Sequence, residues 1–568
     1  MIDMRKAPYS LQEEDAAWVE NTLAGMTLEE KIGQLFCPMG GSQEPEALKA
    51  LTDRHVGGIM FRPGTGKETQ AAHRFLQEHS KYPMLIAADL EQGGVGSASD
   101  GTLFGRQMLA AATGEPEQAY RLGYVSGTEG AIVGVNWDFG PVVDIDRNWR
   151  NPITNVRTYG SDPACVLKMG QEFMRGLHEA GMAAAIKHFP GDGCDERDQH
   201  LHPTVNDLSA EKWMESYGHI YRTLVEEGAD TVMVGHIAQP AWVKKLNPEA
   251  SFEEQYRPAT LSPELIEGLL RKEIGFNGMI VSDATTMVGF TQDLPRREAV
   301  PYCISIGVDM FLFNRNFEED YQYMMEGYQK GILTEERLNE AVTAILALKA
   351  HLKLHKKKAE GTLVPGEEAL AGLRSSQFQE WAKEAADKGI TLIKDTRQYL
   401  PITPERYKKI ALFVLNDAGL FGGANEQLEE DLRAEFTRRG FEVYEAPDGE
   451  FFGRDDRMSA KSFEGRYDLA LYVLNLSTSS SNTVVRIGWK GFLGRGNNPW
   501  FVSEIPVVAA SLANPYHLID IPRIHTYINA YTNTPCMIET LVDKLTGVSP
   551  FKGKSPVDAF CGRMDTRL

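Results

Sequence analysis

Short apolar runs and longer stretches with apolar residues at helical spacing alternate along about the first 350 residues. A short run bounded by turn residues predicts a buried strand, and apolar residues three and four apart predict a helix. The runs that predict strands lie near Ile32 (IGQLF), Val56 (VGGIMF), Pro83 (PMLIAAD), Val135 (VNWDFGPVVD), Ala183 (AAAIKHF), Asp230 (DTVMVGH), Gly278 (GMIVSDA) and Asp309 (DMFLFN). Helices are expected between most of them, for example over 115–133 and over 262–276, where Ser262 and Pro263 are start signals. Eight strands alternating with helices predict an α/β fold, a (β/α)8 barrel of the TIM type.

Polar residues close most of these runs. They are Asp89, Asp144, Lys187, His188, His236 and Asp283. In a barrel of parallel strands the carboxyl ends of all strands meet at one end, and barrel enzymes carry their chemistry there. The pattern therefore predicts an active site at that end.

The segment from Lys187 to Pro203, KHFPGDGCDERDQHLHP, carries the most chemistry in the chain. Its glycines and proline break regular structure. Asp198 and His200 are two residues apart, so in a locally extended loop they share one face and the carboxylate can hold the imidazole. For an isolated pair of this kind a polar surface loop is the simpler interpretation, but its charged neighbours favour an oriented general acid/base. His202 is the main rival for that role, and the D-x-H spacing favours His200.

Asp283 follows the apolar run MIVS. A carboxylate after a buried strand costs desolvation energy unless it is paired or used, which makes Asp283 a candidate nucleophile. It also suits the N-cap of a helix beginning in TTMVGF. Taken alone the two interpretations are equal, and the strand pattern favours the nucleophile.

A chain of 568 residues is too long for one barrel. Further strands are expected at ITLIKD, KKIALFVLND, YDLALYVLNL, IPVVAASL and HTYINAY, with helices such as NEQLEEDLRAEFTRRG between them. We expect a barrel domain over 1–355, a linker over 356–375 and a smaller α/β sandwich over 376–568.

Composition narrows the possible partners. There are 59 basic and 79 acidic residues, which argues against nucleic acid or an anionic membrane as a main partner. The first residues contain no apolar core typical of a signal peptide, and the six cysteines form no CxxC pair, so a cytoplasmic location is expected. PGTGKET at Pro63 lacks the spacing of a phosphate loop, and Cys194, His200 and His202 lack a familiar zinc spacing. No cofactor or metal is expected, and the oligomeric state stays open.

The chain resembles glycoside hydrolase family 3, most closely its bacterial β-N-acetylglucosaminidase (β-hexosaminidase) branch. The likeness runs from MTLEEKIGQLF at Met26 through PMLIAADLEQGG, NWDFGPVVDI and NVRTYGSDP, and is strongest in KHFPGDG with DQH, RPATLSPELIEGLLRKEIGF and VSDATTM. The resemblance implies catalytic roles for Asp283 as nucleophile, His200 as acid/base and Asp198 as the partner of His200. It further implies that the hydroxyls of the terminal sugar are held by Asp89, Arg157, Lys187 and His188.

Three positions depart from the family pattern. Asp192 stands where the branch usually has histidine, which adds a carboxylate to the catalytic loop. Ala284 replaces a second Asp that is not the nucleophile. Ser97 stands where a sugar-binding arginine is expected, so substrate identity is the property most affected.

The expected function is that of a retaining exo-β-N-acetylglucosaminidase that forms a covalent glycosyl-aspartate, with His200 and Asp198 as the acid/base pair. An imidazole does not repel an incoming anion as a carboxylate does, so a β-N-acetylglucosaminide phosphorylase is an alternative. A β-glucosidase or β-xylosidase of the same family, and a sugar-binding relative without catalysis, are further alternatives.

Overall fold

The computed structural model describes residues 2–416, 426–445, 459–489 and 497–568. It divides into two compact units. The first consists of Met1–Phe104, Ala119–Asn148 and Pro163–Gln379, and the second of Gly105–Gln118, Trp149–Asp162 and Glu380–Leu568. The domain boundaries expected from the sequence stay a prediction.

A curled parallel sheet forms the centre of the first unit. Its strand order is β10-β8-β6-β5-β4-β3-β2. The bounds are β2 (Met39–Gly40), β3 (Gly58–Phe61), β4 (Leu85–Ala88), β5 (Trp137–Asp138), β6 (Ala183–Phe189), β8 (Thr231–Val234) and β10 (Met279–Ser282). The short β1 (Phe36–Cys37) directly precedes β2 and pairs with β11 (Phe311–Leu312), and a bridge between Val281 and Met310 joins β10 to the start of β11. The two edges of the sheet therefore meet, and the predicted TIM-type barrel is confirmed.

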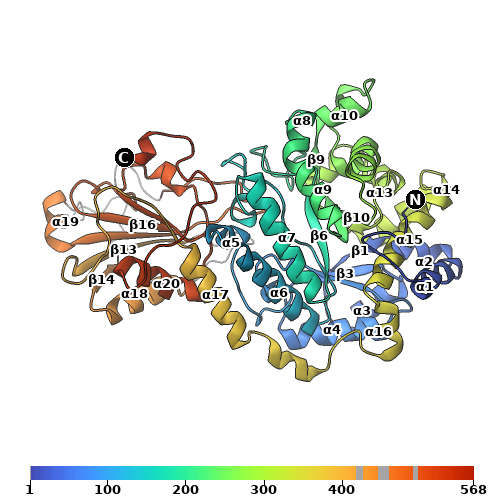
Figure 1. The fold of residues 1–568 in the computed structure, drawn as a ribbon, viewed down its shortest axis with the longest axis horizontal. Helices are drawn as coiled ribbons and strands as arrows, with labels where there is room; N and C mark the ends of the chain where they lie inside the picture. Colours follow the sequence, from blue (N-terminus) through green and yellow to red (C-terminus); the bar gives the residue numbers. More distant parts are fainter. Residues whose placement is uncertain (1, 417–425, 446–458, 490–496) are drawn as a thin grey trace. The chain divides into compact units, whose positions relative to one another are not determined.

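Helices surround these strands, as Figure 1 shows for α4, α6 and α7. The helices of this part of the chain are α1 (Glu13–Ala24), α2 (Leu28–Gln34), α3 (Pro45–Asp53), α4 (Gly66–His79), α6 (Pro116–Ile132), α7 (Pro163–Glu179), α8 (Ala210–Trp213), α9 (His219–Glu226), α10 (Pro240–Leu246), α11 (Phe252–Gln255), η5 (Glu264–Ile274), α12 (Val288–Thr291), α13 (Arg296–Ser305), α14 (Phe317–Gln329), α15 (Glu335–His351) and α16 (Leu354–Glu360). Because helices cover the outside and side chains fill the inside, every residue of β6 is buried, which explains why the strands are continuous apolar runs and do not alternate with polar residues.

The strand expected at IGQLF was placed too early. Ile32 and Gln34 lie in α2, and the strand begins only at Phe36. Thr27 and Glu30 form a capping box that starts α2, and a short apolar run does not distinguish a buried helix end from a strand. The helix expected over 262–276 is confirmed as η5, with the Ser262 hydroxyl accepting from the amide of Leu265 at 3.4 Å.

The second unit, within its described residues, contains a sheet of order β12-β17-β16-β15-β13-β14. The bounds are β12 (Thr391–Asp395), β13 (Lys409–Asn416), β14 (Glu442–Glu445), β15 (Leu469–Asn475), β16 (Val507–Ser511) and β17 (Thr526–Asn529). All pairs are parallel except β12 with β17. The helices are α5 (Gln107–Ala112), α17 (Ser376–Gly389), α18 (Leu428–Arg438), α19 (Ala460–Arg466) and α20 (Pro535–Thr546), and Figure 1 shows α18 and α20 side by side. The predicted α/β sandwich is confirmed, and β14 was missed because its residues are polar and mostly exposed.

All six cysteines are free thiols. In the described part of the chain, no helix has both the length and the apolarity that a bilayer crossing requires.

Candidate active site

The polar residues that close the barrel strands gather as the sequence predicts. Asp89 follows β4, Lys187 and His188 lie near the carboxyl end of β6, and Asp283 directly follows β10. Because these strands belong to one parallel sheet, their carboxyl ends lie at the same end of the barrel.

Lys187 lies between two carboxylates. Its ammonium contacts Oδ1 of Asp89 at 2.9 Å and Oε1 of Glu91 at 2.8 Å. The side chains of Lys187 and Glu91 are buried, whereas that of Asp89 is 48% exposed. Burial restrains the ammonium, and the exposed Asp89 carboxylate can accept hydrogen bonds from an incoming hydroxyl.

His188 is oriented by Asp144. Nδ1 of His188 donates to Oδ2 of Asp144 at 2.7 Å, and the amide of His188 donates to Oδ1 at 3.1 Å. The same Oδ1 accepts from the amide of Asp192 at 2.8 Å. Asp144 therefore fixes the imidazole of His188 and the beginning of the following loop together.

Asp283 is half-buried, and backbone hydrogen bonds position both its main chain and its carboxylate. Its amide donates to the carbonyl of Val234 in β8 at 2.8 Å, and its Oδ1 accepts from the amide of Ala284 at 2.7 Å. Burial raises the pKa of the Asp283 carboxyl, but His188, His236, His200 and the Ala284 amide together lower it below its ordinary value. The carboxyl is thus ionised at neutral pH, as a nucleophile must be.

His200 and Asp198 form the pair that their spacing suggests. Nδ1 and the amide of His200 both donate to Oδ1 of Asp198, at 2.6 and 2.8 Å. The loop is not extended, however: the amides of Leu201 and His202 donate to the carbonyl of Asp198, which makes a turn. A turn brings the carboxylate back onto its own downstream backbone, which is the usual behaviour of Asp. His202 is exposed.

The loop that carries His200 is joined to the segment after Asp283. The carbonyl of His200 accepts from the amide of Val288 at 2.9 Å, and that of Gln199 accepts from Gly289 at 3.2 Å. A β-carbon at Gly289 would lie 2.5 Å from the Gln199 carbonyl oxygen, so glycine permits this approach. The positions of His200 and Asp283 are therefore coupled through the backbone.

His236 links the loop that carries His200 to the segment that follows Asp283 by hydrogen bonds. Its Nε2 donates to the Ala284 carbonyl at 3.0 Å, and its Nδ1 accepts from the Thr260 hydroxyl at 2.9 Å. Its amide donates to Oε1 of Gln199 at 2.9 Å. Burial lowers the pKa of His236, in keeping with a neutral ring whose two nitrogens both have hydrogen-bond partners.

Two of the residues that depart from the family pattern, Asp192 and Ser97, form hydrogen bonds within their own loops. The carboxylate of Asp192 accepts from the amide of Gly193 at 2.7 Å and from Nε2 of Gln199 at 3.2 Å, so it braces the loop internally. The hydroxyl of Ser97 donates to the carbonyl of Gly94 at 3.1 Å, which leaves a short, buried side chain where an arginine was expected.

Arg157 lies in η2 (Asn155–Arg157), within the segment that belongs to the second unit. Its role in holding the sugar stays a prediction.

The sequence did not identify Glu91 as a partner of Lys187 or Asp144 as the partner of His188. Asp144 was visible as the end of an apolar run, but the partner of a buried cation depends on tertiary contacts that spacing does not encode.

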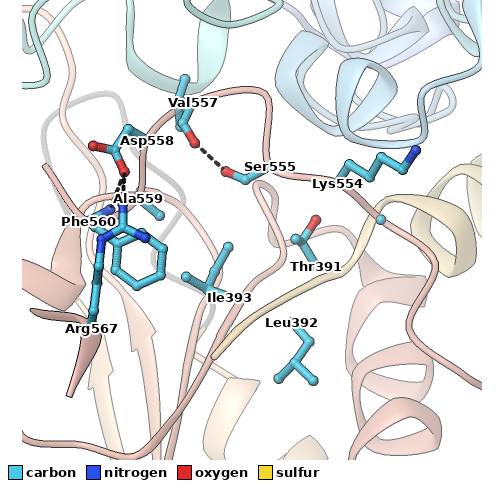
Figure 2. A pocket seen from close by; sticks show the side chains of 11 residues that line it. Thr391, Leu392, Ile393, Lys554, Ser555, Val557, Asp558, Ala559, Phe560 and Arg567 are labelled. Atoms are coloured by element: carbon cyan, nitrogen blue, oxygen red, sulfur yellow. Dashed lines mark hydrogen bonds and ion pairs between the residues drawn. The ribbon is translucent and has the colours of Figure 1, made fainter. Parts of the chain in front are cut away.

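A hollow of about 380 Å³ lies elsewhere, in the second unit beside β12. Figure 2 shows Arg567 near Asp558 and over the ring of Phe560, which its guanidinium carbon approaches to 4.1 Å. These charged side chains are exposed and none of the predicted site residues lines the hollow, so it does not compete with the strand ends as an active site.

Among the residues that the structure describes, no three or more His, Cys, Asp or Glu side chains are grouped to hold a metal ion.

Comparisons with known proteins agree with the barrel and its motifs. The model of the glycosyl hydrolase family 3 N-terminal domain matches residues 27–348. A β-N-acetylglucosaminidase/β-glucosidase from Cellulomonas fimi is 45% identical over 573 residues, covering 100% of both chains. A solved β-glucoside phosphorylase, BglX, bound to 2FGlc has a TM-score of 0.93 at 40% identity and covers 99% of each chain. A family 3 β-N-acetylglucosaminidase from Paenibacillus sp. has a TM-score of 0.78 at 24% identity, covers 94% of this chain and 99% of its own, and supports the fold alone.

Proposed function

The chain belongs to glycosyl hydrolase family 3, and from that premise we propose that it is a retaining exo-acting β-N-acetylglucosaminidase. One observation carries the mechanism. The His200–Asp198 pair is fastened, through the Val288 amide, to the segment that follows the ionised Asp283. Double displacement at an anomeric carbon requires a nucleophile and an oriented acid/base in fixed positions relative to each other.

In the first step a carboxylate oxygen of Asp283 attacks the anomeric carbon, and the bond from that carbon to the leaving oxygen breaks. The leaving oxygen keeps the electron pair and takes a proton from Nε2 of His200. Nδ1 of His200 donates to Asp198 throughout, so the carboxylate stabilises the imidazolium and fixes the tautomer left after transfer.

In the second step water attacks the anomeric carbon of the glycosyl-enzyme and gives a proton to Nε2 of His200. The bond to Asp283 breaks and both groups return to their starting states, with the sugar released in its original configuration. Asp89, Lys187 and His188 would bind the hydroxyls of the terminal sugar, and Arg157 is proposed as a further contact.

The substrate class and the stereochemistry can be tested together. A panel of p-nitrophenyl β-glycosides is assayed, and the anomer first released from the best substrate is identified by proton NMR. We expect the N-acetylglucosaminide to be cleaved with the β-anomer appearing first. Release of the α-anomer first would contradict double displacement, and faster cleavage of the glucoside or xyloside would contradict the substrate class.

A second candidate is phosphorolysis of the same or a related β-glycoside. It is favoured by the 40% identity, over 99% of each chain, to a solved β-glucoside phosphorylase. The acid/base here is an imidazole, which repels a phosphate anion less than a carboxylate does. The panel is therefore run in phosphate and in chloride at equal ionic strength, with products followed by phosphorus NMR. A sugar 1-phosphate formed only in phosphate identifies a phosphorylase, and an unchanged rate with free sugar as product identifies a hydrolase.

A further inference from the structure

Asp138, the last residue of β5, is fully buried and has no part in the chemistry above. Its Oδ1 accepts a hydrogen bond from the amide of Leu90 at 2.9 Å. Its Oδ2 has no hydrogen-bond partner among the residues that the structure describes. A buried carboxyl group with one neutral partner is costly to maintain, which raises the question of what it does.

Leu90, whose amide Asp138 accepts from, lies between the two carboxylates that contact Lys187. Leu90 separates Asp89 from Glu91, and both of these contact the Lys187 ammonium, at 2.9 and 2.8 Å. The Leu90 carbonyl is also restrained, because it accepts from the Ser126 hydroxyl at 2.7 Å. With its amide held by Asp138, the middle of the Asp89–Leu90–Glu91 turn is fixed from both sides.

The charges around Asp138 indicate its protonation state. Lys187 is the nearby cation, and the two carboxylates Asp89 and Glu91 already accompany it. Burial raises the pKa of Asp138 to about 8; the Leu90 amide and Lys187 act to lower it, and the charges of Asp89 and Glu91 act to raise it. At neutral pH the group is therefore mostly the uncharged acid, which can accept from Leu90 without drawing Lys187 away from its partners.

We propose that Asp138 is a positioning residue for the group Asp89, Glu91 and Lys187, and that it acts through the backbone amide of Leu90. This inference rests on the proposed function, because it takes that group to bind the terminal sugar. A neutral acid and an amide have similar shape and both carry an acceptor oxygen, so Asn is the conservative replacement and Leu is the one that deletes the acceptor.

The first test compares Asp138→Leu with Asp138→Asn on the p-nitrophenyl glycoside that the wild type cleaves best. We expect KM to rise roughly tenfold in the Leu variant, since loss of one buried hydrogen bond is of that size, while kcat changes by less than about threefold. The Asn variant should keep both constants near wild type at pH 7. An unchanged KM in a folded Leu variant would overturn the proposal.

The second test uses pH and needs only the Asn variant. As the pH rises through about 8, the wild-type Asp138 ionises and adds a negative charge beside Asp89, Glu91 and Lys187, so KM should rise. Asn carries no titrating proton, and the rise should be absent. The same alkaline rise in both proteins would show that another group is responsible and would contradict the neutral-acid assignment.

A readout without substrate separates this inference from the proposed function. Hydrogen exchange at the Leu90 amide, measured on peptides of the full-length protein, should be about tenfold faster in Asp138→Leu and unchanged in Asp138→Asn. Asp230→Asn is the matched control, a buried carboxylate at the amino end of β8 that accepts from the Ala184 amide at 2.9 Å, and it should leave KM and Leu90 exchange unchanged. Absence of glycoside cleavage by the wild type would refute the proposed function, whereas unchanged Leu90 exchange in the Leu variant would refute the positioning role.

Discussion

Asp309 lies at the amino end of β11 and Asp283 at the carboxyl end of the neighbouring β10, and the two carboxylates have opposite surroundings. Asp309 accepts from Arg271 at 2.8 Å, from Arg337 at 2.6 Å and from the Ile280 amide at 2.8 Å. Asp283 accepts from the amide of Ala284 and otherwise faces imidazole rings. Asp309 is bound by two guanidinium groups and a backbone amide, whereas Asp283 lies near the rings of His188, His236 and His200.

The same difference appears at a second pair of sites. At the amino end of β8, Asp230 binds His178 at 2.7 Å and the Ala184 amide at 2.9 Å. In the loop that follows the carboxyl end of β6, Asp198 holds His200, whose side chain is 26% exposed. Similar residue types thus serve stability at one end and, by our proposal, chemistry at the other, because strand direction decides which loops surround them.

The largest effect is expected from Asp283→Ala. Without the carboxylate the covalent route has no nucleophile, so kcat should fall by roughly 10⁴-fold or more while the thermal midpoint stays near wild type. Steady-state kinetics and a thermal melt measure the two quantities. Asp230→Asn, at the amino end of β8, should lower the thermal midpoint and leave kcat near wild type. Appreciable turnover by Asp283→Ala would contradict the comparison.

The next effect concerns His200→Ala. Its rate should fall by about 10²- to 10⁴-fold on glycosides with basic leaving groups and little on activated aryl glycosides, because protonation matters only when the departing oxygen is basic. Added azide should restore turnover and yield a β-glycosyl azide. His202→Ala is the matched control; if leaving-group dependence appears there and not in His200→Ala, the wrong histidine has been assigned.

At the amino end, Asp309→Asn should reduce stability without altering the chemistry. Removal of one partner from a buried ion group costs about 3–5 kcal/mol, since Arg271 and Arg337 are left without their shared carboxylate. Denaturant unfolding measures this loss. Asp53→Asn, which breaks an exposed ion pair with Lys49, should cost less than about 0.5 kcal/mol, and equal losses in the two variants would argue against a special role for Asp309.

The smallest effect is a pH dependence of stability at the same end. Burial lowers the pKa of His178, but its hydrogen bond to Asp230 and the charge of Asp230 outweigh this, and the pKa is raised above its ordinary 6.5. The protonated form is therefore favoured by folding. Its contribution is complete below about pH 6.5 and is lost as the pH rises through the raised pKa of the folded protein.

We expect this contribution to be under about 1 kcal/mol, because His178 is partly exposed. The free energy of unfolding is measured between pH 5 and about 8. In His178→Gln the free energy of unfolding should depend less steeply on pH than in the wild type. The control His79→Gln, at an exposed position, should keep the wild-type dependence. An unchanged slope in His178→Gln would assign the pH dependence to another group.

Much of the fold was predictable because the signal repeats. Eight apolar runs, five of which close on polar residues, define a barrel even when one of them, at IGQLF, is placed a few residues early. The short polar β14 was missed because an exposed edge strand carries no apolar run.

In the site, the pairing of Asp198 with His200 was predictable from their spacing, although a turn makes it and not an extended loop. The partners Glu91 and Asp144 and the buried Asp138 were not assigned these contacts. They depend on how adjacent strands and loops meet in space, which a single sequence does not state.

The central claim is that the carboxyl end of the barrel holds a nucleophile at Asp283. It is tested most directly by treating the full-length protein with an activated 2-deoxy-2-fluoro-β-glycoside, which slows release of the glycosyl-enzyme, and locating the added mass by peptide sequencing. We predict one sugar per chain, attached to the peptide that contains Asp283. Attachment to a different residue, or turnover of the corresponding glycoside without any covalent adduct, would contradict the claim.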